Sequence, residues 1–290
     1  MEKKIMACVV CGGSTFHMLF SHRSGEMGRC LSCGLVQLAP MPRAREIAKL
    51  YHEDFDHFAP YIDQLPVHRI YFREKINDVL LRFRGLRITN NGLRLLDIGC
   101  AMGVLLEEAE KQGIEAVGID ISRDAVAYCR KHGLTAHAGT IQSVKKLAPA
   151  AFDAVTAFQV IEHERDPLGF MERVHTLLKK GGMVVLATPN YGGWWRKIMG
   201  RRWFGFAHPE HVVLLDDNSM RTFLAKVGFR DIEIRPDSPR PFPLSFAFKR
   251  AADYFPFLAW LLKPFGKFID RFNIKNPINP WDDMIVYARK

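Results

Sequence analysis

Two Cys-x-x-Cys pairs near the start of the 290-residue chain could bind a metal ion. Cys8 and Cys11 form the first pair, Cys30 and Cys33 form the second, and a glycine follows each pair. Two thiolates three positions apart on a tight turn can reach one ion, and a second such turn closes a tetrahedral shell of the kind that holds structural zinc. The pattern predicts a zinc ribbon over residues 1–42, with no coordination position left open for catalysis. A redox pair is a weaker alternative, because neither pair opens the helix of a βαβ unit.

A glycine-bearing turn and a later aspartate in the middle of the chain could bind a nucleoside. An apolar run containing Asp97 enters a turn over residues 99–103, and a second apolar run ends at Asp120. Glycine lets a backbone approach a ligand closely, and a carboxylate about 20 residues later can accept the ribose hydroxyl hydrogens. The plainer alternative is a glycine turn and a surface aspartate in an ordinary α/β domain. A dinucleotide-binding dehydrogenase is disfavoured, because the turn ends before a Gly-x-Gly-x-x-Gly pattern is complete.

Residues 93–188 must supply the elements that hold these groups. Short apolar runs alternate there with helical patterns, which is typical of a parallel sheet covered by helices on both faces. Ligands of such sheets bind at the carboxyl ends of the strands, where both aspartates fall. We expect strands at 93–98, 116–119, 135–138, 154–158, 183–187 and 232–234, and helices at 104–112, 124–132, 168–178 and 219–227.

Residues 43–92 are expected to form a helical linker or cap between the ribbon and this core. The sequence Ala39-Pro40-Met41-Pro42 makes a stiff exit from the ribbon, because each proline fixes its own φ angle. A helical stretch follows at 43–51. Apolar residues at intervals of three and four predict a second helix over 68–83, with one buried face.

With these motifs, the chain resembles the class I S-adenosylmethionine-dependent methyltransferases, in the branch that includes ubiquinone-type O-methyltransferases. The resemblance extends over most of residues 93–235. It implies a Rossmann-like α/β fold with seven mostly parallel strands, the last at 284–288. Further matching segments are Phe152-Asp153-Ala154-Val155, Val160-Ile161-Glu162-His163, Asp166-Pro167, Leu178-Lys179-Lys180-Gly181-Gly182 and Thr188-Pro189-Asn190.

The resemblance implies S-adenosylmethionine as the cofactor. The turn would hold its methionine part, Asp120 its ribose and Thr140 with Ile141 its adenine, while Gln159 would lie near the sulfonium. Ala101 departs from the usual central glycine of the turn, and Thr140 stands where an acidic residue is common. The predicted cofactor-binding residues are Asp97, Gly99, Cys100, Ala101, Gly103, Asp120, Ile121, Thr140, Ile141 and Gln159.

His163 is the candidate for the general base of a methyl transfer. It follows the fourth strand, on the rim that faces the cofactor, and an imidazole with an ordinary pKa of ~6.5 can remove a proton near neutral pH. The alternative is that Glu162 and His163 orient a loop. Downstream, His208 and His211 are close enough to suggest a metal, but no further matched ligand is evident in the sequence.

A methyltransferase domain over 93–290 would carry cap insertions at 191–211 and 240–280. The segment 194–204 combines tryptophan with arginine and leaves three interpretations open: an acceptor-binding lid, a membrane-surface contact, or a stacking platform for single-stranded nucleic acid. The segment 242–272 is rich in Phe, Leu and Lys, which favours a helical cap and would also suit a lipid-linked acceptor.

Composition narrows the function classes further. With 48% hydrophobic and 25% charged residues, the chain is not generally disordered. The segment before Cys8 lacks the apolar core of a secretory signal, and no apolar run approaches the ~20 residues of a spanning helix. We therefore expect a cytoplasmic protein, with peripheral association at a membrane left open.

The net charge of +10 bears on the partners, because it is concentrated outside the core. Residues 191–290 contain 17 Lys and Arg against 10 Asp and Glu, whereas residues 91–190 contain 11 against 12. A small-molecule acceptor is expected, and the basic flanks leave room for an anionic membrane or a lipid-linked substrate. One alternative is an RNA methyltransferase whose ribbon and basic flanks contact phosphates. The other is a nucleoside-binding module without turnover. The oligomeric state is not indicated.

Overall fold

The computed structural model describes residues 7–22, 25–43, 64–83, 92–208, 210–239 and 282–290. The helix expected over 43–51, apart from its first residue, and the insertion expected over 240–280 lie outside the described residues.

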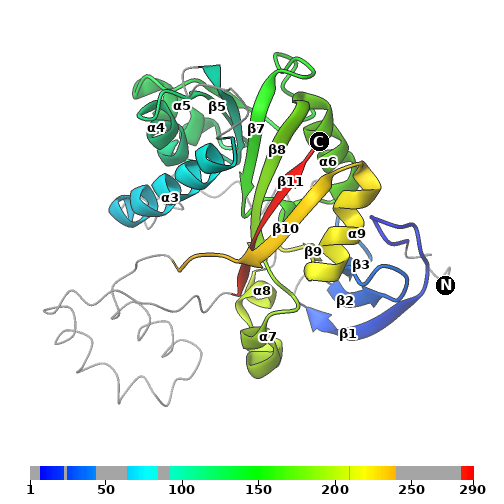
Figure 1. Cartoon of the computed structure of the whole chain (residues 1–290). Coiled ribbons are helices and arrows are strands. Elements are labelled where there is room, and N and C mark those ends of the chain that lie inside the picture. The colour runs from blue at the N-terminus through cyan, green and yellow to red at the C-terminus, as the bar shows by residue number, and fades with distance from the viewer. Residues whose placement is uncertain (1–6, 23–24, 44–63, 84–91, 209, 240–281) are drawn as a thin grey trace, which may run out of the picture.

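A seven-stranded, mostly parallel sheet forms the centre of the molecule (Figure 1). Its strand order is β10-β11-β8-β7-β4-β5-β6, and β11 runs in the direction opposite to the other six strands. The sequence prediction of the fold is confirmed. The strands are β4 (Arg94–Ile98), β5 (Glu115–Asp120), β6 (Ala136–Ala138), β7 (Phe152–Phe158), β8 (Leu178–Pro189), β10 (Arg230–Pro236) and β11 (Asp283–Arg289).

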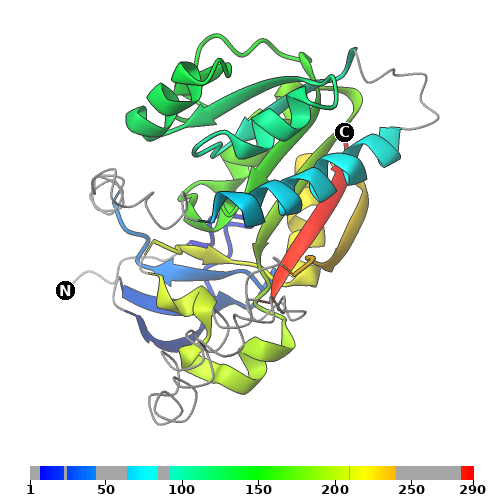
Figure 2. The same ribbon diagram turned by 90° about the vertical axis from the view of Figure 1, so that its left-hand side faces the viewer.

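Helices cover both faces of this sheet, with α3, α4 and α5 on one side and α6 and α9 on the other (Figures 1 and 2). Side-chain hydrogen bonds cap the N-termini of several of these helices. The Ser122 hydroxyl accepts a hydrogen bond from the Ala125 N–H before α5, and Asp216 with Ser219 forms a capping box at α9. The helices are α3 (Leu65–Phe83), α4 (Val104–Glu110), α5 (Arg123–Lys131), α6 (Pro167–Leu177) and α9 (Asp217–Val227).

Alternation along the strands divides the buried apolar residues into two cores. Leu95 packs with the α3, α4 and α5 side, whereas Leu96 packs with the α6 and α9 side. Val185 and Val184 divide in the same way in β8. Successive side chains of a strand point to opposite faces, so a continuous apolar run fills both cores. Burying one such side chain contributes roughly 1.5 to 3 kcal/mol.

The amino-terminal strands β1 (Phe16–His22), β2 (Gly25–Cys30) and β3 (Val36–Ala39) form a second, antiparallel sheet. This ribbon sheet gains a fourth strand, β9 (Val213–Leu214), from the other end of the chain. The Leu38 N–H also donates to the Val212 carbonyl at 2.9 Å. The ribbon is therefore fastened to the main domain by backbone hydrogen bonds, which the sequence did not indicate.

Short helices follow β8 and pack beside the ribbon sheet (Figure 1). They are α7 (Trp194–Met199), the 3₁₀ turn η4 (Gly200–Arg202) and α8 (Phe204–Ala207). Phe206 meets Phe20 of β1 edge to face, with ring centroids 4.6 Å apart. Across the described ranges, none of the helices combines the length and apolar character needed to cross a membrane.

Candidate functional site

The turn after β4 is tied directly to the next strand, β5. The N–H groups of Gly99 and Cys100 both donate to the Ile119 carbonyl, at 2.8 and 3.0 Å. Gly99 and Gly103 have φ angles of 75° and 73°, in the left-handed region that favours glycine. Ala101 also has a positive φ, 45°, which costs a residue with a Cβ about 1–2 kcal/mol. This strain explains why glycine is usual at the position that Ala101 occupies here.

Asp120, at the end of β5, clasps this turn through backbone hydrogen bonds. Oδ2 accepts from the Ala101 N–H and Oδ1 from the Ser122 N–H, both at 2.8 Å. Burial raises the pKa of Asp120, while these two N–H groups oppose the rise. Because each carboxylate oxygen has two lone pairs, one on each oxygen remains for a ligand hydroxyl. The carboxylate and the turn therefore lie side by side, with the donor and acceptor chemistry that a ribose requires.

Asp97 lies beneath the turn, in β4. Its side chain is buried, and the Thr156 hydroxyl donates to Oδ1 at 2.7 Å. Burial raises the pKa of Asp97 to about 7, and the nearby charge of Asp120 acts in the same direction. Asp97 therefore holds a proton more readily than an ordinary aspartate.

The remaining predicted cofactor-binding residues lie at the carboxyl ends of strands in the same parallel sheet. Ile121 is 51% exposed beside Asp120, and Ile141 is buried after β6. The Thr140 N–H donates to the Ser143 hydroxyl at 2.8 Å, which closes a turn there. Gln159, directly after β7, has a φ of 56°. The fold thus brings these segments to the carboxyl ends of neighbouring strands, and their contacts with a cofactor stay predictions.

Cys8, Cys11, Cys30 and Cys33 form a compact group in the ribbon. The Sγ atoms of Cys8 and Cys33 are 3.5 Å apart, as are those of Cys11 and Cys30, and all four lie within 4.8 Å of one another. Sulfurs around a tetrahedral zinc with ~2.3 Å bonds are about 3.8 Å apart. Burial raises the pKa of the Cys8 and Cys33 thiols, which disfavours their thiolates unless a cation is bound. The donor set and spacing fit one zinc ion.

Two equivalent turns bring these cysteines together. The Gly12 N–H donates to the Cys8 carbonyl and the Gly34 N–H to the Cys30 carbonyl, each at 2.9 Å. Gly12 and Gly34 have φ angles of 76° and 78°. The glycine after each pair therefore permits the turn, as the sequence predicted.

A histidine cluster joins two segments that are far apart in the sequence. Glu162 and His163 lie in the 3₁₀ turn η3 (Ile161–His163) after β7, whereas His211 lies between α8 and β9. The rings of His163 and His211 are 4.9 Å apart, and one ligand atom from each of the three residues falls within 4.8 Å of the others. The Val212 N–H donates to the Glu162 carbonyl at 2.8 Å, which fixes the two segments together.

Hydrogen bonds define the tautomers of this cluster. Nδ1 of His163 lies 3.1 Å from the Glu210 carbonyl oxygen, and Nδ1 of His211 lies 2.9 Å from that of Gly205. Because a carbonyl oxygen only accepts, each Nδ1 donates, and each Nε2 keeps its lone pair. The Glu162 carboxylate accepts from the Thr188 hydroxyl at 3.0 Å.

Burial also keeps these imidazoles neutral. It lowers the pKa of His163 to about 4 and that of His211 to about 3. At neutral pH both rings are therefore uncharged and keep a lone pair on Nε2, and two imidazoles with a carboxylate can bind a divalent transition metal. Sequence reasoning missed Glu162 as the matched ligand for His211, because the two residues lie far apart in the sequence and meet only in the tertiary structure.

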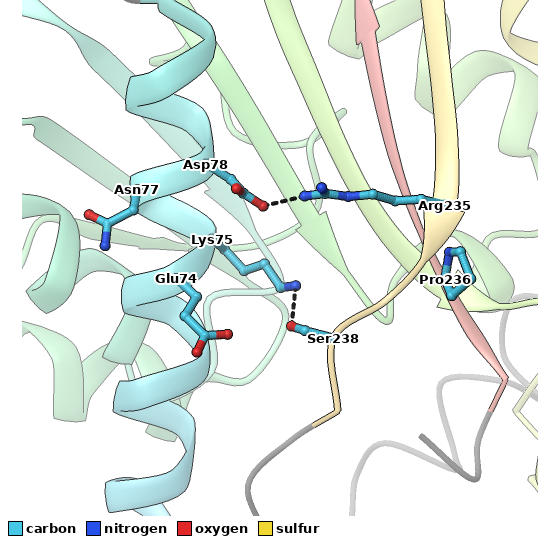
Figure 3. A pocket seen from close by; sticks show the side chains of 7 residues that line it. All are labelled: Glu74, Lys75, Asn77, Asp78, Arg235, Pro236 and Ser238. Atoms are coloured by element: carbon cyan, nitrogen blue, oxygen red, sulfur yellow. Dashed lines mark hydrogen bonds and ion pairs between the residues drawn. The ribbon is translucent and has the colours of Figure 1, made fainter. Parts of the chain in front are cut away.

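A buried ion pair holds α3 against the end of β10. Lys75 contacts the Asp237 carboxylate and donates to the Ser238 hydroxyl at 2.8 Å, and the Tyr71 hydroxyl also donates to Asp237. A cavity of about 420 Å³ lies between the two elements (Figure 3). The charged groups that line this cavity are largely paired with one another. These pairs hold α3 in place, and the cavity offers no evident ligand site among the described residues. It is lined by Glu74, Lys75, Asn77, Asp78, Arg235, Pro236 and Ser238.

Comparison with known sequences places this geometry in context. Residues 68–234 match the family described as a methyltransferase domain. A ubiquinone biosynthesis O-methyltransferase from Xanthomonas campestris pv. campestris (strain B100) is 35% identical over 133 residues, covering 44% of this chain and 53% of the relative. The enzyme of the same description from Xylella fastidiosa (strain 9a5c) is 32% identical over 137 residues, covering 45% and 53%. The chain thus spans about half the length of the curated relatives it matches.

Solved structures show the same fold at lower identity. An S-adenosylmethionine-dependent methyltransferase from Archaeoglobus fulgidus aligns with a TM-score of 0.53 and 19% identity, covering 80% of this chain and all of that one. A chain from the complex between the Haloferax volcanii Trm112 methyltransferase activator and a methyltransferase aligns with a TM-score of 0.55 and 14% identity, covering 82% of this chain and 98% of that one. These similarities support the fold and carry no acceptor assignment.

Proposed function

Because the chain belongs to the methyltransferase domain family, we propose that it transfers a methyl group from S-adenosylmethionine to a hydroxyl group of a small-molecule acceptor. The relatives described as O-methyltransferases support oxygen as the methylated atom. We propose a sugar, a lipid-linked intermediate or a natural-product intermediate as the acceptor class. The basic flanks support an acceptor that carries negative charge or resides at an anionic surface.

The observation that carries this proposal is the clasp between Asp120 and the turn that begins at Gly99. The backbone N–H groups of Ala101 and Ser122 orient the carboxylate and leave one lone pair on each oxygen. Two ribose hydroxyls can donate to these lone pairs. A loop aspartate without such support would not be oriented in advance.

The cofactor supplies an activated methyl group on a positively charged sulfur when it is bound. The chain must then orient the acceptor, exclude water and receive the proton. Orientation can lower a barrier by ~7 to 11 kcal/mol, and a positioned base adds about 10²- to 10⁴-fold. We propose that Gly99, Cys100, Ala101 and Gly103 surround the methionine part, and that Gln159 lies near the sulfur. We further propose that Asp97, Ile121, Thr140 and Ile141 complete the nucleoside site.

We propose that His163 receives the acceptor proton at Nε2. Its low pKa keeps the ring neutral at physiological pH, and the Glu210 carbonyl holds the proton on Nδ1. The ring is 20% exposed, so it is accessible from one side. His211 and Glu162 restrict its orientation by their contact with it.

We propose that Cys8, Cys11, Cys30 and Cys33 hold one structural zinc ion. The sulfur spacing and the two glycine turns support this assignment. Four protein ligands leave no position for a substrate, so the ion would maintain the ribbon and, through β3, the pairing with β9.

Incubation of the chain with radiolabelled S-adenosylmethionine and fractionated cell extract tests the proposal. Label is expected in a small-molecule or lipid fraction. Asp120→Ala should abolish labelling at low cofactor concentration, whereas Asp124→Ala, an exposed carboxylate four positions away, should not. Label in RNA would instead support an RNA methyltransferase. Cofactor binding without label in any fraction would support a non-catalytic nucleoside-binding module.

A further inference from the structure

Helix α7 presents two large apolar side chains to solvent. Trp194 is 56% exposed and Ile198 is 65% exposed. The two residues are four positions apart, so they lie on the same face of the helix. Most large apolar residues that the structure describes are buried. Two large apolar side chains exposed on one helix face therefore indicate a surface that binds a partner.

Basic side chains lie in and directly after the same helix. Lys197, Arg201 and Arg202 are all exposed. The sequence contains no acidic residue between Gly192 and His208. Asp282 lies near Lys197 and offsets part of this charge, but the three basic side chains still leave a positive excess that complements an anionic partner.

The base of this segment is held firmly. Trp203 is fully buried, and its ring meets Phe206 edge to face at 5.2 Å. Arg196 is used internally, because its Nε donates to the Tyr191 carbonyl and its guanidinium lies 4.3 Å from the Tyr191 ring centroid. Helix α7 thus lies on a packed base beside the ribbon sheet, at one end of the molecule (Figure 1).

We propose that Trp194, Lys197, Ile198, Arg201 and Arg202, together termed the α7 surface, dock on an anionic lipid bilayer. Tryptophan is favoured at the membrane–water boundary, where its ring contacts acyl chains and its N–H stays near water. Lysine and arginine beside it attract anionic headgroups. A short helix with this division of side chains lies in the plane of the interface and does not span it.

The same residues fit single-stranded nucleic acid less well. The Trp194 ring stacks on Trp195, with centroids 4.2 Å apart and planes 29° apart, so one of its faces is already covered. Ile198 offers no aromatic face to a base. Base stacking would therefore leave Ile198 without a partner, whereas a bilayer would cover both Trp194 and Ile198.

Docking here deepens the proposed function and rests on it. Helix α7 follows β8 within five residues of Pro189, at the carboxyl edge of the parallel strands. Asp120 ends β5 at the same edge. A bilayer bound by the α7 surface would lie toward the carboxyl ends of these strands. A lipid-linked acceptor could then reach the site while it remains in the membrane.

Vesicle flotation of the full chain tests the proposal, with phosphatidylcholine vesicles that contain or lack about 30% phosphatidylglycerol. One variant combines Trp194→Ser with Ile198→Ser, and a second combines Lys197→Gln, Arg201→Gln and Arg202→Gln. The matched control is Leu81→Ser, which removes a side chain of 53% exposure from α3. A single-stranded RNA oligonucleotide provides the competing ligand.

We expect binding to the anionic vesicles at low salt and loss of binding near about 0.5 M salt. The charge variant should bind at least about tenfold more weakly and the apolar variant about fivefold, with Leu81→Ser unchanged. Absence of binding to anionic vesicles, equal binding by all variants, or retention of RNA in place of vesicles would overturn the proposal. Calorimetry with S-adenosylmethionine on the same proteins separates this failure from failure of the proposed function, because both variants should keep their cofactor affinity.

Discussion

The Asp120 clasp and the histidine cluster are assembled in different ways. Asp97, the turn and Asp120 belong to one βαβ unit, and β4 pairs directly with β5. Glu162 and His163 meet His211 across a long sequence separation, through direct backbone hydrogen bonds and beside the pairing of β9 with β3 of the ribbon. The first site is local in sequence, whereas the second joins distant segments and lies beside the ribbon. Disorder of the ribbon should therefore disturb the histidine cluster and leave the Asp120 clasp intact.

The largest effect is expected from Cys33→Ser. Structural zinc contributes ~10 kcal/mol or more to the folding of isolated zinc fingers, so loss of one ligand should disorder the ribbon. Zinc content should fall from about one ion per chain to near none, and turnover should fall with it. Elemental analysis and hydrogen exchange of β2 and β3 measure these changes.

The Cys33→Ser variant should keep its affinity for S-adenosylmethionine within about twofold of the parent, because the Asp120 clasp lies outside the ribbon. Ser32→Ala, between the second pair of cysteines, is the matched control and should retain zinc. A folded parent protein that contains no zinc after careful preparation would remove the metal assignment.

Substitution of His163 by alanine should produce the next largest effect. Loss of a positioned base lowers kcat by about 10²- to 10⁴-fold. The cofactor affinity should stay within about twofold, because His163 is not part of the turn or its clasp. His132→Ala, at an exposed position after α5, serves as the control. Undiminished turnover in the His163 variant would remove this residue from the mechanism.

The pH dependence of kcat sharpens the role of His163. A base must be unprotonated to act, so activity is lost as pH falls through its pKa. Burial lowers that pKa to about 4, and the acid limb should therefore lie near pH 4 rather than near an ordinary 6.5. At pH 5 the two cases differ about 30-fold in the unprotonated fraction. A limb near pH 6.5 in protein that stays folded would contradict the buried, neutral imidazole.

Asp97→Asn should have the smallest effect, and it should act on stability. The pKa of Asp97 is raised to about 7 from 3.8, so the folded state binds this proton more tightly than the unfolded state. Stability from this group is present below pH 4, falls as pH rises to 7, and stays low above that. Asparagine removes this penalty while its oxygen still accepts from Thr156.

The Asn variant should gain roughly 1 to 4 kcal/mol over the parent at pH 8 and little at pH 4. Denaturant unfolding at both pH values measures the difference, with Asp124→Asn as an exposed control. An equal gain at both pH values would show that the Asp97 charge is not the cause.

Much of the fold was predictable, because buried strands and amphipathic helices leave periodic signals. The helix expected over 168–178 matches α6 within a residue at each end. The strand expected at 183–187 begins earlier in the structure, at Leu178. The prediction missed this start because Lys179 to Gly182 carry no apolar pattern. A register shift in the pairing of β7 with β8 occurs at this point. Pattern reading therefore located the element but not its irregular start.

The histidine cluster was harder to predict for a physical reason. Strand β9 has two residues, which are too few to show alternation, and its partner lies in the ribbon. His163 was identified from its place after β7, but its contact with His211 required the tertiary structure. In contrast, the four cysteines and the Asp120 clasp follow from short, local spacings.

Isothermal titration of S-adenosylmethionine into the parent protein, Asp120→Ala and Asp124→Ala tests the central claim most directly. Each hydrogen bond to a charged group contributes ~1.5 to 3 kcal/mol, so loss of two from the ribose should weaken binding about 100-fold or more. The account predicts this loss for Asp120→Ala alone, with zinc content unchanged. Equal affinities in all three proteins, or no binding by the parent, would contradict it.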